Sequence, residues 1–406
     1  MGYRIKRNHC VVSFIYKINQ YHKYVVNIRM DTELLIAQGN THREQHQPDL
    51  ALACYAQAFV QDYTSAGAFN NYGNVMREMG FPDRAQPFLE HAIRIDPSNE
   101  TARFNLAVCL LLQGNYQQGW PAYEDRWTFA HLKGTLPQLP QPRWSGQDLS
   151  GKTILVIGEQ GLGDTIQFAR FVLNLQQLGA TVVMVVDPAM IGLFGPGTIA
   201  YNDPLPPYDY WTTIMSIPGI LGITLENLSS PLSYLSPDQA LVRQWQQRLG
   251  IKKKLRVGFS WSGRKDTWIH QHKSVPFGQI VNMIQTCPQY EWINLQIDAS
   301  EEESQVLNQL GCATYPGTIH NMADSAALIT CMDVVVSVDT AVSHLAGALG
   351  RPTWIMLNQY GTDWRWLLNR ADSPWYPTVR LFRQPTIGNW GPVMTQISKH
   401  LNLFKI

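Results

Sequence analysis

The sequence predicts an α-helical repeat domain followed by two α/β domains with parallel sheets. Three observations carry this prediction. A pattern of small and large apolar residues recurs with a 34-residue period through residues 31–133. Short β-branched runs alternate with helical patterns in residues 151–245, and they do so again in residues 250–406. Residues 134–150 are rich in proline and show no periodicity, so we expect them to form an extended linker.

Length and composition narrow the classes of protein. The 406 residues exceed one ordinary domain, and 45% apolar with 16% charged residues is typical of a globular protein. A net charge of +1 gives no basis for binding nucleic acid, and no apolar run is long enough for a transmembrane segment. The six cysteines form no Cys-x-x-Cys pair, which favours reduced thiols in the cytoplasm over disulfides or a zinc site.

Residues 1–30 remain unassigned. They are basic and aromatic, they lack a signal-peptide cleavage site, and the pattern of the rest of the chain begins only after Met30. We expect this segment to be poorly packed or to precede the native start.

The repeat is clearest in its central copy. Gly73 and Ala85 are small, whereas Phe69, Tyr72 and Leu89 are large. Small residues where helices cross, with large ones between them, suit pairs of antiparallel helices. The pattern resembles the tetratricopeptide repeat, with degenerate copies on either side, and generic helical hairpins are the alternative. Such repeats stack into a superhelix that binds peptides or a neighbouring domain, so a protein partner is expected on them.

A loop with two glycines follows the first predicted strand, residues 153–158. Gly161, Gly163 and Asp164 lie in this loop, before a helix expected over residues 165–178 and a strand over 181–186. A dinucleotide site is disfavoured, because Ile166 takes the place of the third glycine. Asp164 is a candidate general base at the carboxyl edge of the sheet, and the alternative is that it caps the helix. Glycine and proline interrupt the pattern beyond Pro188, so we expect this domain to be shortened.

The second α/β domain centres on a strand–helix junction. Residues 334–338 predict a buried strand, and a helical pattern begins at Ala341. Backbone N–H groups at such a helix start bind anions, so Asp339 and Thr340 mark a candidate phosphate site. An ordinary N-cap at either residue is the alternative. Asp324 is expected to cap the preceding helix.

The remaining strands and helices of this domain are also predicted. Strands are expected over residues 255–261, 292–296, 353–357 and 379–382. Helices are expected after Pro276, from an acidic start at Glu301, over residues 325–332 and from Pro392. This alternation makes a nucleotide-sized domain.

Two loops of the second α/β domain have an unusual composition. The loop after the first strand carries Arg264 and Lys273, whose charges would face the phosphate site, and a solvated basic loop is the alternative. Residues 363–377 are rich in tryptophan, for which packing is favoured over stacking on sugars. If the tryptophans instead stack on a sugar, Asp363, Arg365 and Asp372 would contact that sugar at the rim of its site.

These features together resemble the GT-B glycosyltransferases, which have two Rossmann-like domains, the first for the acceptor and the second for the donor. Residues 161–164 (Gly-Leu-Gly-Asp) and residues 339–352 resemble the heptosyltransferase-like glycosyltransferase family 9. With the repeats in front, residues 50–400 are similar to bacterial proteins that fuse tetratricopeptide repeats to such a region. The O-GlcNAc transferases share the layout, but their catalytic motifs are not matched.

The resemblance implies roles for individual residues. Asp164 takes the place of the general base, and Gly161 and Gly163 shape its loop. The remaining residues are implied to bind the donor. They are Lys273 and Arg264 at the phosphates, Asp339 beside the sugar, Thr340 and Ala341 at the start of the diphosphate-binding helix, Gln296 and Glu302 at the nucleoside, and His344 in the first turn, where a structural role is the alternative.

The implied activity is transfer of a sugar from a nucleotide-sugar donor to an acceptor glycan, peptide or protein. The sequence contains no Asp-x-Asp motif, so an inverting mechanism without metal or cofactor is expected. A cation and a helix start would stabilise the departing nucleoside diphosphate instead. A catalytically degenerate scaffold with the same fold is the alternative, because the acceptor domain is shortened. The presence of both Asp164 and Lys273 favours the enzyme.

Overall fold

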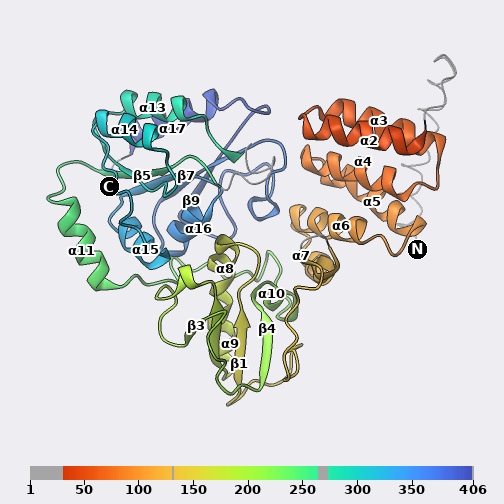
Figure 1. Ribbon diagram of the computed structural model, residues 1–406, viewed down its shortest axis with the longest axis horizontal. Coiled ribbons are helices and arrows are strands. Elements are labelled where there is room, and N and C mark those ends of the chain that lie inside the picture. The colour runs from red at the N-terminus through yellow and green to blue at the C-terminus, as the bar shows by residue number, and fades with distance from the viewer. Residues whose placement is uncertain (1–30, 130–131, 264–272, 405–406) are drawn as a thin grey trace. The chain divides into compact units, whose positions relative to one another are not determined.

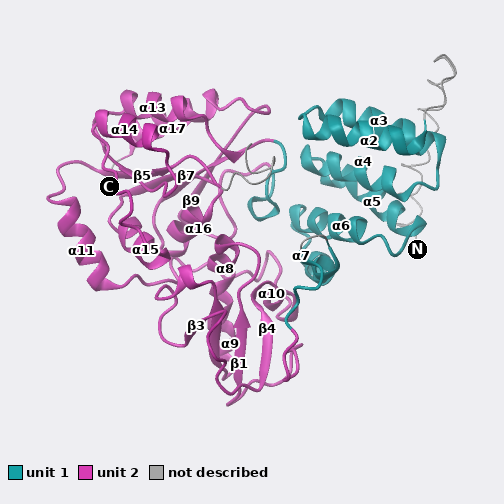
Figure 2. Cartoon of the chain, viewed as in Figure 1, with its two compact units in different colours: residues 1–137, 360–368 teal, residues 138–359, 369–406 magenta. Residues whose placement is uncertain are grey.

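The computed structural model describes residues 31–129, 132–263 and 273–404 (Figure 1). Contacts divide the chain into two compact units. The first contains the residues up to Pro137 and the segment Tyr360–Leu368, and the second contains Gln138–Gln359 and Asn369–Ile406 (Figure 2). Within the described ranges, no helix is long and apolar enough to cross a membrane.

The first unit is built from helical hairpins, as predicted. Its six main helices are α2 (Thr32–Glu44), α3 (Pro48–Gln61), α4 (Ala66–Glu78), α5 (Pro82–Ile95), α6 (Glu100–Leu112) and α7 (Tyr116–Tyr123). The side chains of Asp31, Ser65 and Asn99 cap α2, α4 and α6, and these three residues follow one another at 34-residue intervals. The period seen in the sequence is therefore the period of the hairpins.

Small residues in the repeats allow the two helices of a hairpin to approach each other. A Cβ atom at Gly73 would lie 2.8 Å from Leu89 Cγ, and one at Gly39 would clash with the ring of Tyr55. Tyr55 and Leu89 are fully buried. The small and large residues of the predicted pattern thus face each other where the paired helices are in contact.

The second unit begins with a four-stranded parallel sheet in the order β3-β2-β1-β4. Its strands are β1 (Thr153–Ile157), β2 (Thr181–Val186), β3 (Thr198–Ala200) and β4 (Tyr210–Thr213). The predicted single helix over residues 165–178 is wrong in detail. The structure has α8 (Leu162–Phe168), a 3-10 turn at Ala169–Phe171 and α9 (Val172–Gln177). The buried Arg170 lies in this 3-10 turn, and its Nε donates to the carbonyl of Gln167 at 2.9 Å.

The second sheet of this unit has five parallel strands in the order β6-β5-β7-β8-β9. They are β5 (Arg256–Ser260), β6 (Glu291–Asn294), β7 (Val334–Val338), β8 (Thr353–Leu357) and β9 (Val379–Arg383). Helices α11 (Gln239–Leu249), α13 (Phe277–Thr286), α14 (Glu301–Gln309), α15 (Met322–Thr330), α16 (Ala341–Ala348) and α17 (Gly391–Leu403) accompany them. One apolar core joins β5 and β7 to α13 and α17. All five predicted strands are present.

Asp324 does not cap α15, because the helix begins earlier and the side chain of Asn321 accepts the hydrogen bond from the Asp324 N–H at 2.9 Å. The tryptophans of residues 363–377 are packed, as favoured: Trp364, Trp366 and Trp375 expose 4%, 0% and 0% of their surface.

Candidate functional site

The turn between β7 and α16 lies at the carboxyl edge of the second sheet. β7 ends at Val338 and α16 begins at Ala341, so Asp339 and Thr340 form the turn. The Thr340 N–H donates to Ser343 Oγ at 3.2 Å, and the Ser343 hydroxyl donates to the Thr340 carbonyl at 2.7 Å. Thr340 is therefore the N-cap, which fixes the backbone from which the first amides of α16 project.

Lys273 and Asp339 meet at this edge. The Lys273 Nζ donates to Asp339 Oδ2 at 2.7 Å, and the two side chains are 15% and 7% exposed. They come together because β5, whose loop carries Lys273, is the neighbour of β7 in the sheet. Arg264, the other predicted cation, lies outside the described residues. The structure thus brings the predicted lysine to the predicted phosphate turn.

His344 links this turn to a buried aromatic cluster. Its Nε2 lies 3.7 Å from Asp339 Oδ1, and its Nδ1 lies 2.9 Å from the Tyr376 hydroxyl. Tyr376 is 1% exposed, and burial raises its pKa well above the ordinary value, so the hydroxyl is protonated. The guanidinium of Arg170 lies 4.7 Å from the centre of the Tyr376 ring. His344 therefore has a structural setting and also faces Asp339.

Arg170 and Tyr376 were not among the predicted residues. Arg170 donates to the carbonyl of Trp375, which lies 205 positions away in the sequence, so no local pattern announces the contact. Tyr376 belongs to the aromatic segment, for which the sequence predicted only packing.

The glycine loop of the first sheet contacts the start of α16. A Cβ atom at Gly163 would lie 2.9 Å from His344 Cδ2 and 3.6 Å from Ala341 Cα. Asp164 stands next to this contact, and its Oδ2 accepts a hydrogen bond from the Gly161 N–H at 2.8 Å. One carboxylate oxygen of Asp164 thus has the capping role that was the alternative prediction. The structure brings the loop of Asp164 together with the turn at Asp339.

Gln296 holds together the loop that follows β5. Its Oε1 accepts hydrogen bonds from the Ser260 hydroxyl at 2.9 Å and from the amides of Trp261 at 3.2 Å and Ser262 at 3.0 Å. Gln296 also lines a cavity of about 40 Å³ at the carboxyl end of β6. Its predicted contact with a nucleoside stays a prediction beside this structural role.

Glu302 lies apart from that cavity. It is exposed on the first turn of α14, and it is not among the lining residues. The following residue, Glu303, accepts a hydrogen bond from the N–H of the N-cap residue Ser300 at 2.9 Å and so completes a capping box. The structure does not bring Glu302 to the other predicted donor residues.

The carboxyl edge of the first sheet carries polar residues that the sequence did not predict as part of a site. Glu159 follows β1, is 8% exposed and accepts a hydrogen bond from the Met215 N–H at 3.0 Å. Tyr201 is 44% exposed as a whole, but the partial burial of its hydroxyl and the nearby carboxylates of Asp187 and Glu159 raise its pKa to about 12. The signal for Glu159 was its place as the first charged residue after a buried strand.

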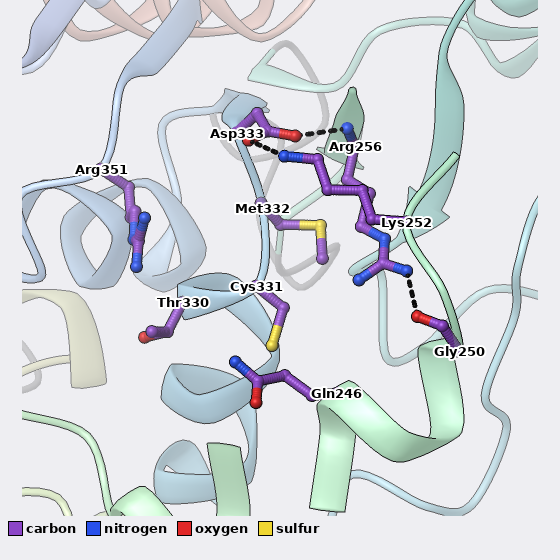
Figure 3. A pocket seen from close by; sticks show the side chains of 9 residues that line it. All are labelled: Gln246, Gly250, Lys252, Arg256, Thr330, Cys331, Met332, Asp333 and Arg351. Carbon is purple, nitrogen blue, oxygen red and sulfur yellow. Dashed lines mark hydrogen bonds and ion pairs between the residues drawn. The ribbon is translucent and has the colours of Figure 1, made fainter. Parts of the chain in front are cut away.

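A cavity of about 380 Å³ opens elsewhere in this unit, at the amino edge of the second sheet. Figure 3 shows Lys252, Arg256 and Asp333 among its lining residues. Asp333 Oδ1 lies 2.7 Å from Lys252 Nζ, and Asp333 Oδ2 accepts the Arg256 N–H at 2.7 Å. Arg256 opens β5 and Asp333 directly precedes β7, whereas the predicted phosphate turn follows β7. This cavity is therefore separate from the predicted site, and none of the predicted residues lines it.

Two segments of the chain match known families. Residues 76–119 match the tetratricopeptide repeat, and residues 301–358 match glycosyltransferase family 9 (heptosyltransferase). The second match begins with α14 and ends just after β8, so it includes the turn at Asp339 and Thr340.

The chain is also similar to individual proteins. It is 30% identical to Protein FlbA of Caulobacter vibrioides over 371 residues, which cover 83% of the chain and 61% of that relative's length. The glycosyltransferase family 9 structure from Veillonella parvula is 13% identical, covers 64% of the chain and 99% of its own length, and has a TM-score of 0.46. The E. coli ADP-heptose LPS heptosyltransferase II is 14% identical, covers 62% of the chain and 98% of its own length, and has a TM-score of 0.44.

The family matches confirm the resemblance found in the sequence. Helical hairpins come first in the chain and two parallel sheets follow, which is the order that the resemblance implied. The chain thus contains one segment that matches the tetratricopeptide repeat, followed by one that matches glycosyltransferase family 9 (heptosyltransferase).

Proposed function

We propose that this protein is a glycosyltransferase that moves a sugar from a nucleotide-sugar donor to an acceptor hydroxyl, with inversion and without a metal ion. The observation that carries the proposal is the contact between two motifs from different sheets. The loop of Asp164 lies against the start of α16, where Gly163 leaves no room for a side chain beside His344. The family 9 match over residues 301–358 supports the same activity.

In the proposed reaction, the donor diphosphate lies at the start of α16. The Ala341 amide at the start of α16 and the Lys273 ammonium stabilise the charge that develops on the leaving group. The acceptor oxygen attacks C1 of the sugar from the face opposite the diphosphate. The bond from C1 to the diphosphate oxygen breaks, and the acceptor proton passes to the Asp164 carboxylate. One displacement at C1 inverts its configuration.

The acceptor would lie at the carboxyl edge of the first sheet, near Glu159 and Tyr201. A buried carboxylate and a protonated phenol provide an acceptor and a donor of hydrogen bonds for sugar hydroxyls or for a peptide. The acceptor is a glycan, peptide or protein, and the repeats offer a surface for a protein partner. We place the reaction in the cytoplasm, since the five cysteines in the described ranges are free thiols.

A scaffold protein that binds a nucleotide sugar without transferring the sugar is the second candidate. The observation in its favour is that the predicted groups have partners within the protein. Lys273 is paired with Asp339 at 2.7 Å, and Asp164 accepts the Gly161 N–H at 2.8 Å. For transfer, the Lys273 ammonium would have to donate hydrogen bonds to the donor diphosphate as well as to Asp339.

Nucleotide binding is the first test. Thermal unfolding of the full chain is measured with a panel of nucleoside diphosphates and nucleotide sugars. A ligand at 100 times its Kd should stabilise the protein by about 2.7 kcal/mol. Lys273→Ala should abolish the response. Lys252→Ala is the matched control, because it breaks another 2.7 Å Lys–Asp pair at the opposite edge of the same sheet and should leave the response intact. If no nucleotide stabilises the protein, both candidate functions fail.

Catalysis is tested with Asp164→Asn. The Asn oxygen can still accept the Gly161 N–H, so the loop should keep its conformation while the basic group is lost. Release of nucleoside diphosphate in the presence of acceptor should fall by roughly 10²- to 10⁴-fold, with nucleotide binding unchanged. Binding by the unaltered protein with no transfer to any acceptor would support the scaffold. Equal transfer rates for Asp164→Asn and the unaltered protein would refute the assignment of the base.

A further inference from the structure

Nine residues between β8 and β9 belong to the repeat unit. The segment Tyr360–Leu368 groups by its contacts with the helical hairpins and has their colour in Figure 2. Its only regular structure is a 3-10 turn at Trp364–Trp366. The segment therefore has little structure of its own, and contacts with the repeats hold it.

The first half of the segment is bound at Glu78, the last residue of α4. The Tyr360 hydroxyl donates to Glu78 Oε2 at 2.7 Å, and the Gly361 N–H donates to the Glu78 carbonyl at 2.8 Å. Both Glu78 and Tyr360 are 3% exposed. A buried carboxylate needs a charge partner, and Arg43 provides one, with Nε 2.9 Å from Glu78 Oε2. Glu78 thus contacts both a side chain and the backbone of the segment.

The second half is bound by aromatic rings. Trp364 is 4% exposed, and its ring centre lies 5.4 Å from that of Trp120 and 6.3 Å from those of Tyr116 and Tyr123, all on α7. The rings of Tyr116 and Trp120 meet it nearly edge-on, at 90° and 83°. The guanidinium of Arg365 lies 4.3 Å from the centre of the Trp364 ring on the segment itself.

The spacing of these contacts describes a recognition motif. A tyrosine hydroxyl reaches the buried carboxylate, a glycine with φ of +68° turns the chain, and a tryptophan three residues further on enters the aromatic cluster. A buried aromatic anchor together with a satisfied polar contact is how hot spots of peptide interfaces are built.

We propose that the repeats are a peptide-binding module whose ligand is residues 360–368 of the same chain. A partner that uses the surface around Glu78 and Trp120 must displace this internal ligand. A partner that leaves the segment in place must bind elsewhere on the repeats. The ligand segment begins three residues after β8, which ends at Leu357 on the carboxyl edge of the second sheet. The proposal does not depend on sugar transfer.

The test supplies the segment as a separate peptide. In a full-length variant, residues 360–368 are replaced by a Gly/Ser segment of equal length, and a fluorescent peptide with the sequence of residues 358–370 is titrated against it by anisotropy. The peptide should bind this variant saturably. It should bind the unaltered chain at least tenfold more weakly, because the tethered segment has an effective concentration near the millimolar range.

Two matched changes locate the site. A peptide carrying Trp364→Ala should bind the replaced variant at least tenfold more weakly, and so should the original peptide when the protein also carries Glu78→Gln. Glu90→Gln on α5 is the control and should not change binding. A folded replacement variant that does not bind the peptide, or an unaltered chain that binds it equally well, overturns the proposal.

Hydrogen exchange covers the case in which the replaced variant does not fold. Trp364→Ala in the otherwise unaltered chain should speed amide exchange in residues 358–370 and in α6 and α7, and leave β1 and β2 unchanged. Unchanged exchange at α7 would show that the segment is not held there and would refute the proposal.

Discussion

Replacing Gly163 by alanine tests the contact between the glycine loop and α16. The new Cβ would lie 2.9 Å from His344 Cδ2, whereas ordinary contacts of a Cβ atom lie at 3.4–4 Å. His344 has little freedom to move, because it is 5% exposed and its Nδ1 is held 2.9 Å from the Tyr376 hydroxyl. Either α8 or the imidazole must shift to accept the methyl group.

This crowding should lower the free energy of unfolding and the melting temperature. An extra methyl group in a well-packed contact typically destabilises by about 1–3 kcal/mol. In a unit of this size, about 1 kcal/mol lowers the melting temperature by roughly 2–4 °C, so a loss of about 2–12 °C is expected. The same shift would separate the loop of Asp164 from the turn at Asp339, so the response to nucleotides should weaken as well.

Gly278→Ala is the matched control for this measurement. Gly278 is the second residue of α13, as Gly163 is the second residue of α8, but nothing lies within 4 Å of its Cβ position. Alanine there should stabilise the protein by about 0.4–1 kcal/mol, because it restricts the unfolded chain. Urea and thermal unfolding of both variants provide the comparison. If the Gly163 variant is as stable as the Gly278 variant, the reasoning about this contact is wrong.

Three further predictions follow from contacts of single residues. Gln296→Ala removes the acceptor of three hydrogen bonds around Trp261 and should cost about 1–3 kcal/mol or more in urea unfolding, and Gln289→Ala, on an exposed side chain, should cost little. Burial alone would raise the pKa of Glu78, but the hydrogen bonds and charge of Arg43 outweigh it and lower the pKa below 4.5. The ionised form thus favours folding, so this stability is present above pH 4.5 and is lost as the pH falls through the folded-state pKa. Melting curves from pH 7 to 3 should show a steeper loss for the unaltered chain than for Glu78→Gln. Burial raises the pKa of Cys109 to about 12, so iodoacetamide at pH 8 should leave this thiol unlabelled until the protein unfolds, and labelling in the folded state would contradict the packing around α6.

Local patterns in the sequence were sufficient to predict most of the helices and strands. The caps at Asp31, Ser65 and Asn99 and the close helix pairing at Gly73 follow from the identity and spacing of neighbouring residues. The strands β1 and β2 and all five strands of the second sheet were likewise visible, because a parallel strand covered on both faces consists of a continuous apolar run. The helix after β1 was one exception, since its break at residues 169–171 leaves no local signal. The short strand β3 was another, because its three residues are only half-buried.

The candidate site was predictable only as separate motifs. The sequence named Asp164, Lys273 and Asp339, and the order of the strands placed Lys273 beside Asp339. The Arg170 and Tyr376 contacts around His344 could not be predicted, because they join side chains far apart in the chain and neither position shows a periodic pattern.

The sequence by itself determined the repeats, the two parallel sheets and the family to which the β7–α16 turn is similar, because each depends on residues within one or two turns or strands of each other. Only the tertiary structure decided that Gly163 lies against His344 and that residues 360–368 belong to the repeat unit. Each feature depends on a close fit between distant segments: Gly163 against His344 in the first case, and Glu78 against Tyr360 in the second. Such a fit has no counterpart in local composition.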